Sequence, residues 1–192
     1  MLKISAILLG AGESKRMGVD KLSLPWGKQT VFEHCLVNLL KSEVKELIVV
    51  LGHKDQILKD LSQSRKVKVV VNPFLKKGMS SSIRRGLQTL HSNCQGILIA
   101  LGDQPYLKTR TINALIRAFD SGKEGIVIPS FHGKKGHPVI FHHKYKKALL
   151  NLKGDVGGRS ILQKYPKDVR VVPVKSEGVV KDIDTWQDYM ES

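Results

Sequence analysis

Short apolar runs alternate with segments of helical pattern along this chain, and that alternation restricts the fold more than any other feature. The apolar runs are of strand length and cover residues 4–9, 47–51, 67–71, 97–101, 126–128, 139–141 and 169–174. The helical patterns cover residues 30–41 and 56–61 and also follow Ser80 and Thr109. Runs that are apolar throughout are typical of strands covered on both faces of a parallel sheet. The order predicts βαβ units and an α/β fold in three layers, α/β/α, with a mostly parallel sheet.

Sequence signals also predict where two of the helices begin. Thr30 and Glu33 have the spacing of a capping box, in which each residue satisfies a backbone N–H near the start of a helix. Ser80, Ser81 and Ser82 are expected to cap the helix that follows them, because serine side chains accept hydrogen bonds from free N–H groups.

The length and the charge of the chain limit its function. Its 192 residues suit one domain, 1–192, because two separate cores would each be small. Lys and Arg number 32 against 17 Asp and Glu, and the net charge of +15 predicts an anionic partner. That partner could be a nucleotide, a phosphorylated metabolite, a nucleic acid or an acidic membrane. With only 6% aromatic residues and scattered basic ones, a nucleic-acid-binding protein is the disfavoured alternative.

Cysteine content and hydropathy exclude further classes. Cys35 and Cys94 have no paired spacing, which excludes a disulfide scaffold and a cysteine-rich zinc module, and both are expected to be reduced thiols in the core. No apolar run is long enough to span a bilayer, and the opening stretch at residues 1–9 is too short for a signal segment. We therefore expect no membrane association and a cytoplasmic location.

The loop after the first apolar run combines glycines with fixed positive charge. Gly10 and Gly12 let a ligand approach the bare backbone, and Arg16 and Lys21 follow in the same segment. Backbone amides with an Arg and a Lys suit a triphosphate. A dinucleotide-binding fingerprint would need Gly or Ala where Lys15 stands, and no Walker A motif fits. The alternative is a surface turn with solvated charges.

Acidic residues follow the fourth apolar run and recur near the end of the chain. Asp103 comes directly after residues 97–101, at the edge where open α/β sheets bind ligands. Asp182 and Asp184 would share one face of an extended segment, opposite Ile183. Carboxylates from these two regions could share a hard cation such as Mg²⁺. The alternative is that Asp103 begins a turn and Asp184 caps the last helix.

Several motifs together resemble the MobA-like nucleotidyltransferases, and in particular the molybdenum cofactor cytidylyltransferase branch. The motifs are Leu-Gly-Ala-Gly-Glu-Ser-Lys-Arg-Met-Gly at 9–18, Lys-Leu-Ser-Leu-Pro at 21–25, Gly-Met-Ser-Ser-Ser-Ile at 78–83, Gly-Asp-Gln-Pro at 102–105, Gly-Lys-Lys-Gly-His-Pro-Val-Ile-Phe at 133–141, Gly-Asp-Val-Gly-Gly-Arg at 154–159 and Asp-Ile-Asp-Thr at 182–185. The resemblance covers essentially the whole chain, and the Gly-Met-Ser-Ser-Ser and Gly-His-Pro motifs are its most specific part.

The resemblance implies a fold, a reaction and a set of site residues. The fold would be that of the nucleotide-diphospho-sugar transferases, which is Rossmann-like, and the reaction would transfer CMP from CTP to the phosphate of molybdopterin or molybdenum cofactor, releasing pyrophosphate. By position, the base and ribose would be held by Leu9, Gly10, Ala11 and Gly12, and the triphosphate by Arg16 and Lys21. The rest of the nucleotide pocket would be formed by Asn72, Ser80, Ser81 and Ser82. The Mg²⁺ cofactor would be bound by Asp103 and Asp184, and the acceptor by Gly136, His137 and Pro138. Lys21, Arg16 and Asp103 would be the catalytic residues.

The choice of nucleotide and acceptor stays open at this point. CTP-using relatives usually carry Leu-Ala-Ala-Gly in the first loop and GTP-using ones Leu-Ala-Gly-Gly, so Ala11 favours CTP whereas Gly10 departs from both. One alternative is a guanylyl- or cytidylyltransferase for another phosphate acceptor, such as a phosphosugar. An alternative of a different class is a non-catalytic accessory that delivers cofactor to a molybdoenzyme. The resemblance favours a monomer whose partner would be a molybdoenzyme or its chaperone.

Overall fold

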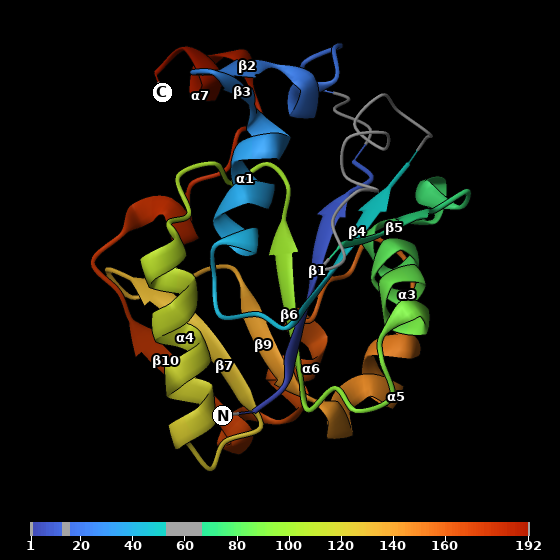
Figure 1. The fold of residues 1–192 in the computed structure, drawn as a ribbon, viewed down its shortest axis with the longest axis vertical. Helices are drawn as coiled ribbons and strands as arrows, with labels where there is room; N and C mark the ends of the chain where they lie inside the picture. Colours follow the sequence, from blue (N-terminus) through green and yellow to red (C-terminus); the bar gives the residue numbers. More distant parts are fainter. Residues whose placement is uncertain (1, 13–15, 53–66, 192) are drawn as a thin grey trace.

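The computed structural model describes residues 2–12, 16–52 and 67–191, in which helices cover both faces of an eight-stranded sheet (Figure 1). The strands follow the order β10-β7-β9-β6-β1-β4-β5, and β8 pairs with β7. Their bounds are β1 Ile4–Gly10, β4 Glu46–Leu51, β5 Val67–Val71, β6 Gly96–Leu101, β7 Ile126–Phe131, β8 Lys134–Lys135, β9 Val139–His142 and β10 Val169–Pro173. Only the β9 and β8 pairings are antiparallel, so the sheet is mostly parallel, as the alternation predicts.

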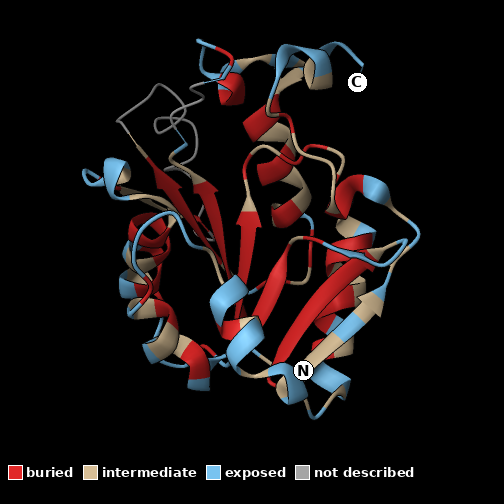
Figure 2. Ribbon diagram, turned by 180° about the vertical axis from the view of Figure 1, so that it is seen from behind, coloured by how far each residue is buried: buried red, intermediate tan, exposed pale blue. Residues whose placement is uncertain are grey.

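Two hydrophobic cores lie on opposite faces of the sheet. Helices α1 (Val31–Leu40) and α4 (Thr109–Ser121) cover one face, and α3 (Met79–Thr89), α5 (Lys146–Leu150) and α6 (Arg159–Lys164) cover the other. Alternate residues of β1 enter the two cores, Ala6 and Leu8 on one side and Ile7 and Leu9 on the other, which explains why its sequence is apolar throughout. The central strands are accordingly buried along their length (Figure 2). The α/β/α architecture is thereby confirmed.

The predicted strands are all present, and the start of α1 is also as predicted. The Thr30 side chain accepts a hydrogen bond from the Glu33 N–H, and Glu33 accepts one from the Thr30 N–H. Cys35 and Cys94 are buried free thiols, and burial raises the pKa of Cys35 to about 12. The helix expected at residues 56–61 lies outside the described residues. None of the described helices is both long and apolar enough to cross a bilayer.

The start of α3 differs from the prediction. Its N-cap is Gly78, and Ser80, Ser81 and Ser82 lie buried within the first turns. The serines were expected to cap the helix because they are the usual capping type, but a carboxylate from a distant loop takes that role. The Met79 N–H donates to Asp155 Oδ1 at 3.1 Å.

Three small elements complete the fold; the sequence analysis did not predict the hairpin among them, and it foresaw the last helix only in the alternative that Asp184 caps it. These are the hairpin of β2 (Pro25–Trp26) and β3 (Gln29–Thr30), and the C-terminal helix α7 (Trp186–Met190). Figure 1 shows α7 and the hairpin side by side at one end of the molecule, and the Tyr189 hydroxyl donates to the Pro25 carbonyl at 2.7 Å.

The register of the sheet brings the loops after β1 and β6 to the same edge. Leu9 pairs with Leu101, and the Gly102 N–H donates to the Leu9 carbonyl at 2.9 Å. Gly10 and Gly102 pack on Phe32 of α1, where an added Cβ would lie 2.5 Å and 2.7 Å from ring carbons. Both positions therefore need glycine for α1 to approach this edge of the sheet so closely.

Candidate active site

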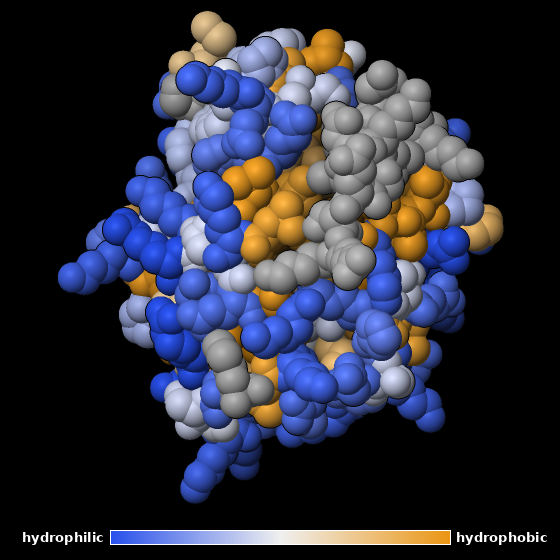
Figure 3. All heavy atoms as spheres, in the orientation of Figure 1, coloured by the Kyte–Doolittle hydropathy of each residue, from blue (hydrophilic) through white to orange (hydrophobic). Residues whose placement is uncertain are grey.

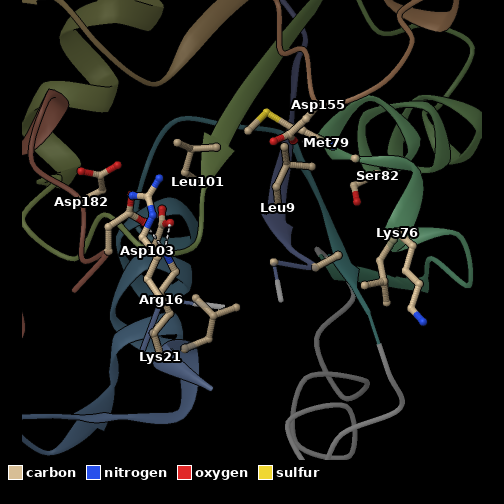
Figure 4. A pocket seen from close by; sticks show the side chains of 16 residues that line it. Leu9, Arg16, Lys21, Lys76, Met79, Ser82, Leu101, Asp103, Asp155 and Asp182 are labelled. Atoms are coloured by element: carbon tan, nitrogen blue, oxygen red, sulfur yellow. Dashed lines mark hydrogen bonds and ion pairs between the residues drawn. The ribbon is translucent and has the colours of Figure 1, made fainter. Parts of the chain in front are cut away.

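A cavity of about 560 Å³ opens at the carboxyl ends of β1 and β6. Its wall combines the loops after these strands with the start of α3 and with two segments from late in the chain (Figure 4). The lining residues are Leu9, Ala11, Gly12, Arg16, Lys21, Leu22, Leu75, Lys76, Gly78, Met79, Ser82, Leu101, Asp103, Asp155, Asp182 and Asp184. Figure 3, in the orientation of Figure 1, shows apolar surface in the upper middle of the molecule with hydrophilic surface beside it. The residues that line the cavity are likewise partly apolar and partly charged, as is common in small-molecule sites.

Lys21 lies at the centre of the charged part. Its Nζ donates to Asp103 Oδ2 and to Asp184 Oδ1, each at 2.7 Å, and its side chain is 11% exposed. Burial alone would lower the pKa of Lys21, but the two carboxylates raise it above its ordinary value, so the ammonium stays charged. A short 3₁₀ turn, Lys21–Ser23, presents this side chain, and Asp20 caps the turn by accepting from the Leu22 N–H.

The two carboxylates come from segments 81 residues apart that are joined by backbone contact. The Ile183 N–H donates to the Asp103 carbonyl at 2.9 Å, and the buried Ile183 side chain packs with Met17 and Val31. Ile183 thus points into the protein while Asp182 and Asp184 both reach the cavity, as the alternation in this segment predicts. The N-cap of α7 is Thr185. The alternative that Asp184 caps this helix is therefore wrong, because its oxygens accept from Lys21 and Arg16 instead.

Arg16 and Asp182 extend this charged group toward the open cavity. The Arg16 Nη1 donates to Asp184 Oδ2 at 3.0 Å, and its side chain is 73% exposed. Burial and the nearby charges of Asp103 and Asp184 raise the pKa of Asp182. Three carboxylates and two cationic side chains therefore meet at one end of the cavity, opposite Asp155, Met79 and Ser82 (Figure 4).

The residues present fit a magnesium ion that also binds a substrate. Asp103 Oδ1 is buried without a hydrogen-bond partner among the described residues, so the negative charge of this carboxylate is only partly satisfied. Within the described ranges, no three His, Cys, Asp or Glu side chains form a complete metal site. Mg²⁺ in phosphate-handling sites is commonly bound by one or two carboxylates together with substrate phosphates and water. The pair Asp103 and Asp184 matches that donor set.

The wall formed by α3 is fixed by buried polar contacts. The Asn72 Nδ2 donates to Ser81 Oγ at 2.8 Å and to Ser82 Oγ at 2.9 Å, and Asn72 Oδ1 accepts from the Phe74 N–H at 3.0 Å. The Ser81 hydroxyl contacts the Phe74 and Gly78 carbonyls. Asn72 and Ser81 are therefore placed to hold Ser82 against the cavity, and neither lines it.

Gly78 explains how the distant loop 154–155 can lie against this wall. Its φ of +83° is in the region that favours glycine, and an added Cβ would lie 2.6 Å from the Asp155 backbone nitrogen. The Ser80 N–H also donates to the Gly154 carbonyl at 3.2 Å. The Gly-Met-Ser-Ser-Ser and Gly-Asp motifs are thus two sides of one contact.

The structure brings together most of the residues that the sequence singled out. The predicted residues that line the cavity are Leu9, Ala11, Gly12, Arg16, Lys21, Ser82, Asp103 and Asp184. Those that do not line it are Gly10, Asn72, Ser80, Ser81, Gly136, His137 and Pro138. Gly10 was expected to hold the base and ribose through its backbone, and a side chain at this position would meet Phe32. Residues 13–15 of the first loop lie outside the described residues.

The Gly-His-Pro segment does not line the cavity, and its histidine lies within the electrostatic influence of Asp103. The His137 N–H donates to the Val179 carbonyl at 2.7 Å, and an added Cβ on Gly136 would collide with the same oxygen. Burial lowers the pKa of His137, although the charge of Asp103 opposes this effect. A neutral imidazole therefore packs close to the carboxylate.

Several lining residues were missed by the sequence reading. Leu75 and Lys76 precede the Gly-Met-Ser-Ser-Ser-Ile motif, Met79 lies within it, and Asp155 belongs to the Gly-Asp-Val-Gly-Gly-Arg motif, to which no role was given. The motif was a usable signal for Asp155. Leu75 and Lys76 carried none, because they line the cavity through the course of the loop after β5.

Comparisons with known proteins agree with this architecture. Residues 6–169 match the family model of the MobA-like NTP transferase domain. The chain is 29% identical over 189 residues to nicotine blue oxidoreductase of Paenarthrobacter nicotinovorans, covering 95% of this chain and 92% of that protein. It is 29% identical over 192 residues to purine catabolism protein PucB of Bacillus subtilis (strain 168), with coverage of 95% and 92%. Molybdenum cofactor cytidylyltransferase of Escherichia coli (strain K12) is 24% identical over 191 residues, with coverage of 99% and 95%.

Solved structures resemble the whole fold. Rv0371c from Mycobacterium tuberculosis H37Rv superposes with a TM-score of 0.82 and 28% identity, covering 99% of this chain and 97% of that chain. Its complex with manganese gives a TM-score of 0.79 at 25% identity, with the same coverage. A nucleotidyl transferase from Methanothermobacter thermautotroptrophicus gives 0.81 at 26% identity, covering 98% and 95%. The fold is therefore that of the nucleotide-diphospho-sugar transferases.

Proposed function

Because this chain belongs to the MobA-like NTP transferase family, we propose that it transfers CMP from CTP to the phosphate of a molybdopterin-type cofactor and releases pyrophosphate. One observation carries the proposal. Lys21 and Arg16 meet Asp103 and Asp184 at one end of a cavity that is large enough for a small-molecule ligand. Such a set suits the handling of phosphate groups because it supplies both fixed cations and metal-binding oxygens.

The nucleotide would lie along the cavity between the first loop and α3. Leu9, Ala11 and Gly12 would face the base and ribose on one side, and Ser82 would face them on the other. The Ala11 methyl group takes up space at a position where GTP-using relatives usually have glycine. This favours the smaller pyrimidine and hence CTP.

The residues at the charged end would position and neutralise the phosphates. The acceptor phosphate would attack the α-phosphorus of CTP, forming a new P–O bond as the bond to pyrophosphate breaks. A phosphate oxygen is already anionic, so this attack needs no strong general base. Arg16 and Lys21 would stabilise the negative charge that develops on the leaving group. Asp103 and Asp184 would hold Mg²⁺, which when bound offsets phosphate charge as a Lewis acid.

The acceptor is proposed from similarity to the cytidylyltransferase of Escherichia coli, because no described side chain identifies it. Asp182 lies at the charged end of the cavity, and it would face the acceptor. The product would pass to a molybdoenzyme or its chaperone.

Pyrophosphate release tests the proposal. The protein is incubated with Mg²⁺ and with CTP or GTP, each with and without molybdenum cofactor. We expect release with CTP only when the cofactor is present. Asp103→Asn should abolish it, whereas Asp120→Asn, at an exposed position far from the cavity, should not. Release with CTP and a phosphosugar, and none with the cofactor, would replace the proposed acceptor.

A further inference from the structure

Lys21 binds the same carboxylates that the proposed function assigns to a divalent metal. Its ammonium contacts Asp103 Oδ2 and Asp184 Oδ1 at equal distances of 2.7 Å. In the proposed reaction the same ammonium is also needed at the phosphates. Lys21 is thus needed at two places, the carboxylates and the phosphates, and the structure shows it at the carboxylates.

The position of Lys21 has an electrostatic reason. The Asp103 side chain is 20% exposed, so its charge is only partly screened by water, and Asp182 adds a third carboxylate nearby. Like charges in a partly buried site destabilise one another unless a cation lies between them. The buried ammonium supplies that cation, and among the described carboxylates the largely exposed Arg16 pairs only with Asp184.

A metal ion would compete with the ammonium for these oxygens. Mg²⁺ binds carboxylate oxygens at about 2.0–2.1 Å, which is closer than any hydrogen bond. The second oxygen of Asp184 accepts from Arg16, and the second oxygen of Asp103 is buried. A cation that bonds to both carboxylates from the cavity must therefore take Asp103 Oδ2, which Lys21 now holds.

We propose that Lys21 is a resident cation of the metal site, which a divalent metal displaces so that the ammonium becomes available to the triphosphate. The inference rests on the proposed function for the identity of the anion, but the exchange itself involves only the metal and this chain. Lys21 keeps the two carboxylates in place in the free enzyme, and it moves to the substrate when the metal takes them over.

The exchange links metal binding to phosphate binding. With Lys21 on the carboxylates, neither the metal ligands nor the ammonium is fully available. Once the metal is bound, both become available together, so metal and triphosphate must increase each other's affinity beyond their direct contact. An arrangement of this kind would limit binding of triphosphate without metal.

Binding of Mn²⁺ alone tests the exchange. Free Mn²⁺ is measured by electron paramagnetic resonance in titrations of the wild type, Lys21→Met and Arg16→Met, without nucleotide. Removal of the competing ammonium should tighten binding in Lys21→Met by at least about tenfold. Arg16→Met also removes one positive charge, but it should change affinity less than threefold because exposed ion pairs are weak. Equal changes in the two variants, or unchanged binding in Lys21→Met, would overturn the proposal.

A second measurement needs no variant. Amine acetylation of the wild type is followed residue by residue by mass spectrometry, with and without saturating Mn²⁺. Labelling of Lys21 should increase several-fold when the metal is added, while Lys68, which pairs with Glu46, keeps its rate. A constant or reduced rate at Lys21 would refute the displacement. Neither experiment contains nucleotide or acceptor. The displacement of Lys21 is therefore tested independently of the pyrophosphate assay, and failure of the proposed function would not by itself overturn it.

Discussion

The replacement Asn72→Asp tests whether the α3 wall of the cavity depends on a buried amide. Asn72 is 1% exposed, and its Nδ2 donates to both Ser81 and Ser82. Aspartate has nearly the same shape, but it places an oxygen where the two N–H donors were. The Ser81 hydroxyl is already engaged with backbone carbonyls, so it cannot turn to the new oxygen without losing those contacts.

The magnitude follows from the hydrogen bonds that are lost. Two buried bonds contribute about 0.5–1.5 kcal/mol each, and leaving buried groups unsatisfied costs about 1–3 kcal/mol more. We expect a loss of about 3 kcal/mol in the free energy of unfolding. For a chain of this size, 1 kcal/mol corresponds to about 2–4 °C in Tm, so Tm should fall by about 6–12 °C.

Urea unfolding and thermal denaturation measure the effect. Asn93→Asp is the matched control, because Asn93 is exposed in a turn and should change stability by less than about 0.5 kcal/mol. The KM for nucleotide should also rise in Asn72→Asp, since Ser82 loses the contact that holds it against the cavity. A Tm within about 2 °C of the wild type would refute the reasoning, because the amide would then be dispensable.

Three further predictions concern other parts of the molecule. Gly10→Ala should destabilise the fold by about 1–3 kcal/mol through its contact with Phe32 in urea unfolding, and Phe32→Leu should restore part of the loss; an unaffected single variant would contradict the packing argument. Burial would raise the pKa of Asp168, but hydrogen bonds, of which that from Lys144 is the largest, hold it at about 2. Because the folded-state pKa lies below the ordinary value, this stabilisation is present above about pH 4 and is lost as the pH falls toward 2. The free energy of unfolding, measured by urea titration at each pH, should therefore fall less steeply between about pH 4 and pH 2 in Asp168→Asn than in the wild type. Parallel pH dependences of the two proteins would exclude the effect. Asp103→Asn should reduce kcat by at least about a hundredfold while the Tm stays near that of the wild type, and retained turnover would place the metal ligand elsewhere.

The sheet was predictable because its pattern is local and repeated. Residues 4–9 are apolar throughout since alternate side chains enter two cores, and that property is visible in the sequence. The start of α1 was equally local, because Thr30 and Glu33 are three residues apart. The antiparallel direction of β9 was not predictable in this way, because its direction depends on its partners β6 and β7.

The site was predictable in its residue types and less so in its contacts. The glycine loop and Asp103 follow predicted strands, so their place at one edge of the sheet could be foreseen. The contact of Lys21 with Asp184 joins residues 163 positions apart, and Asp155, which accepts from the Met79 N–H at the start of α3, is 76 positions away from it. No spacing rule reaches such distances. The packing of Gly10 against Phe32 could not be foreseen, because a glycine beside a ligand loop and a glycine beside a packed ring look the same in the sequence.

The most direct test of the central claim is the identity of the product. The enzyme is supplied with equal concentrations of CTP and GTP together with Mg²⁺ and molybdenum cofactor, and the products are separated and weighed by mass spectrometry. We expect a cytosine dinucleotide form of the cofactor and one pyrophosphate for each molecule formed. A guanine dinucleotide, or unchanged cofactor from a folded and metal-loaded sample, would contradict it.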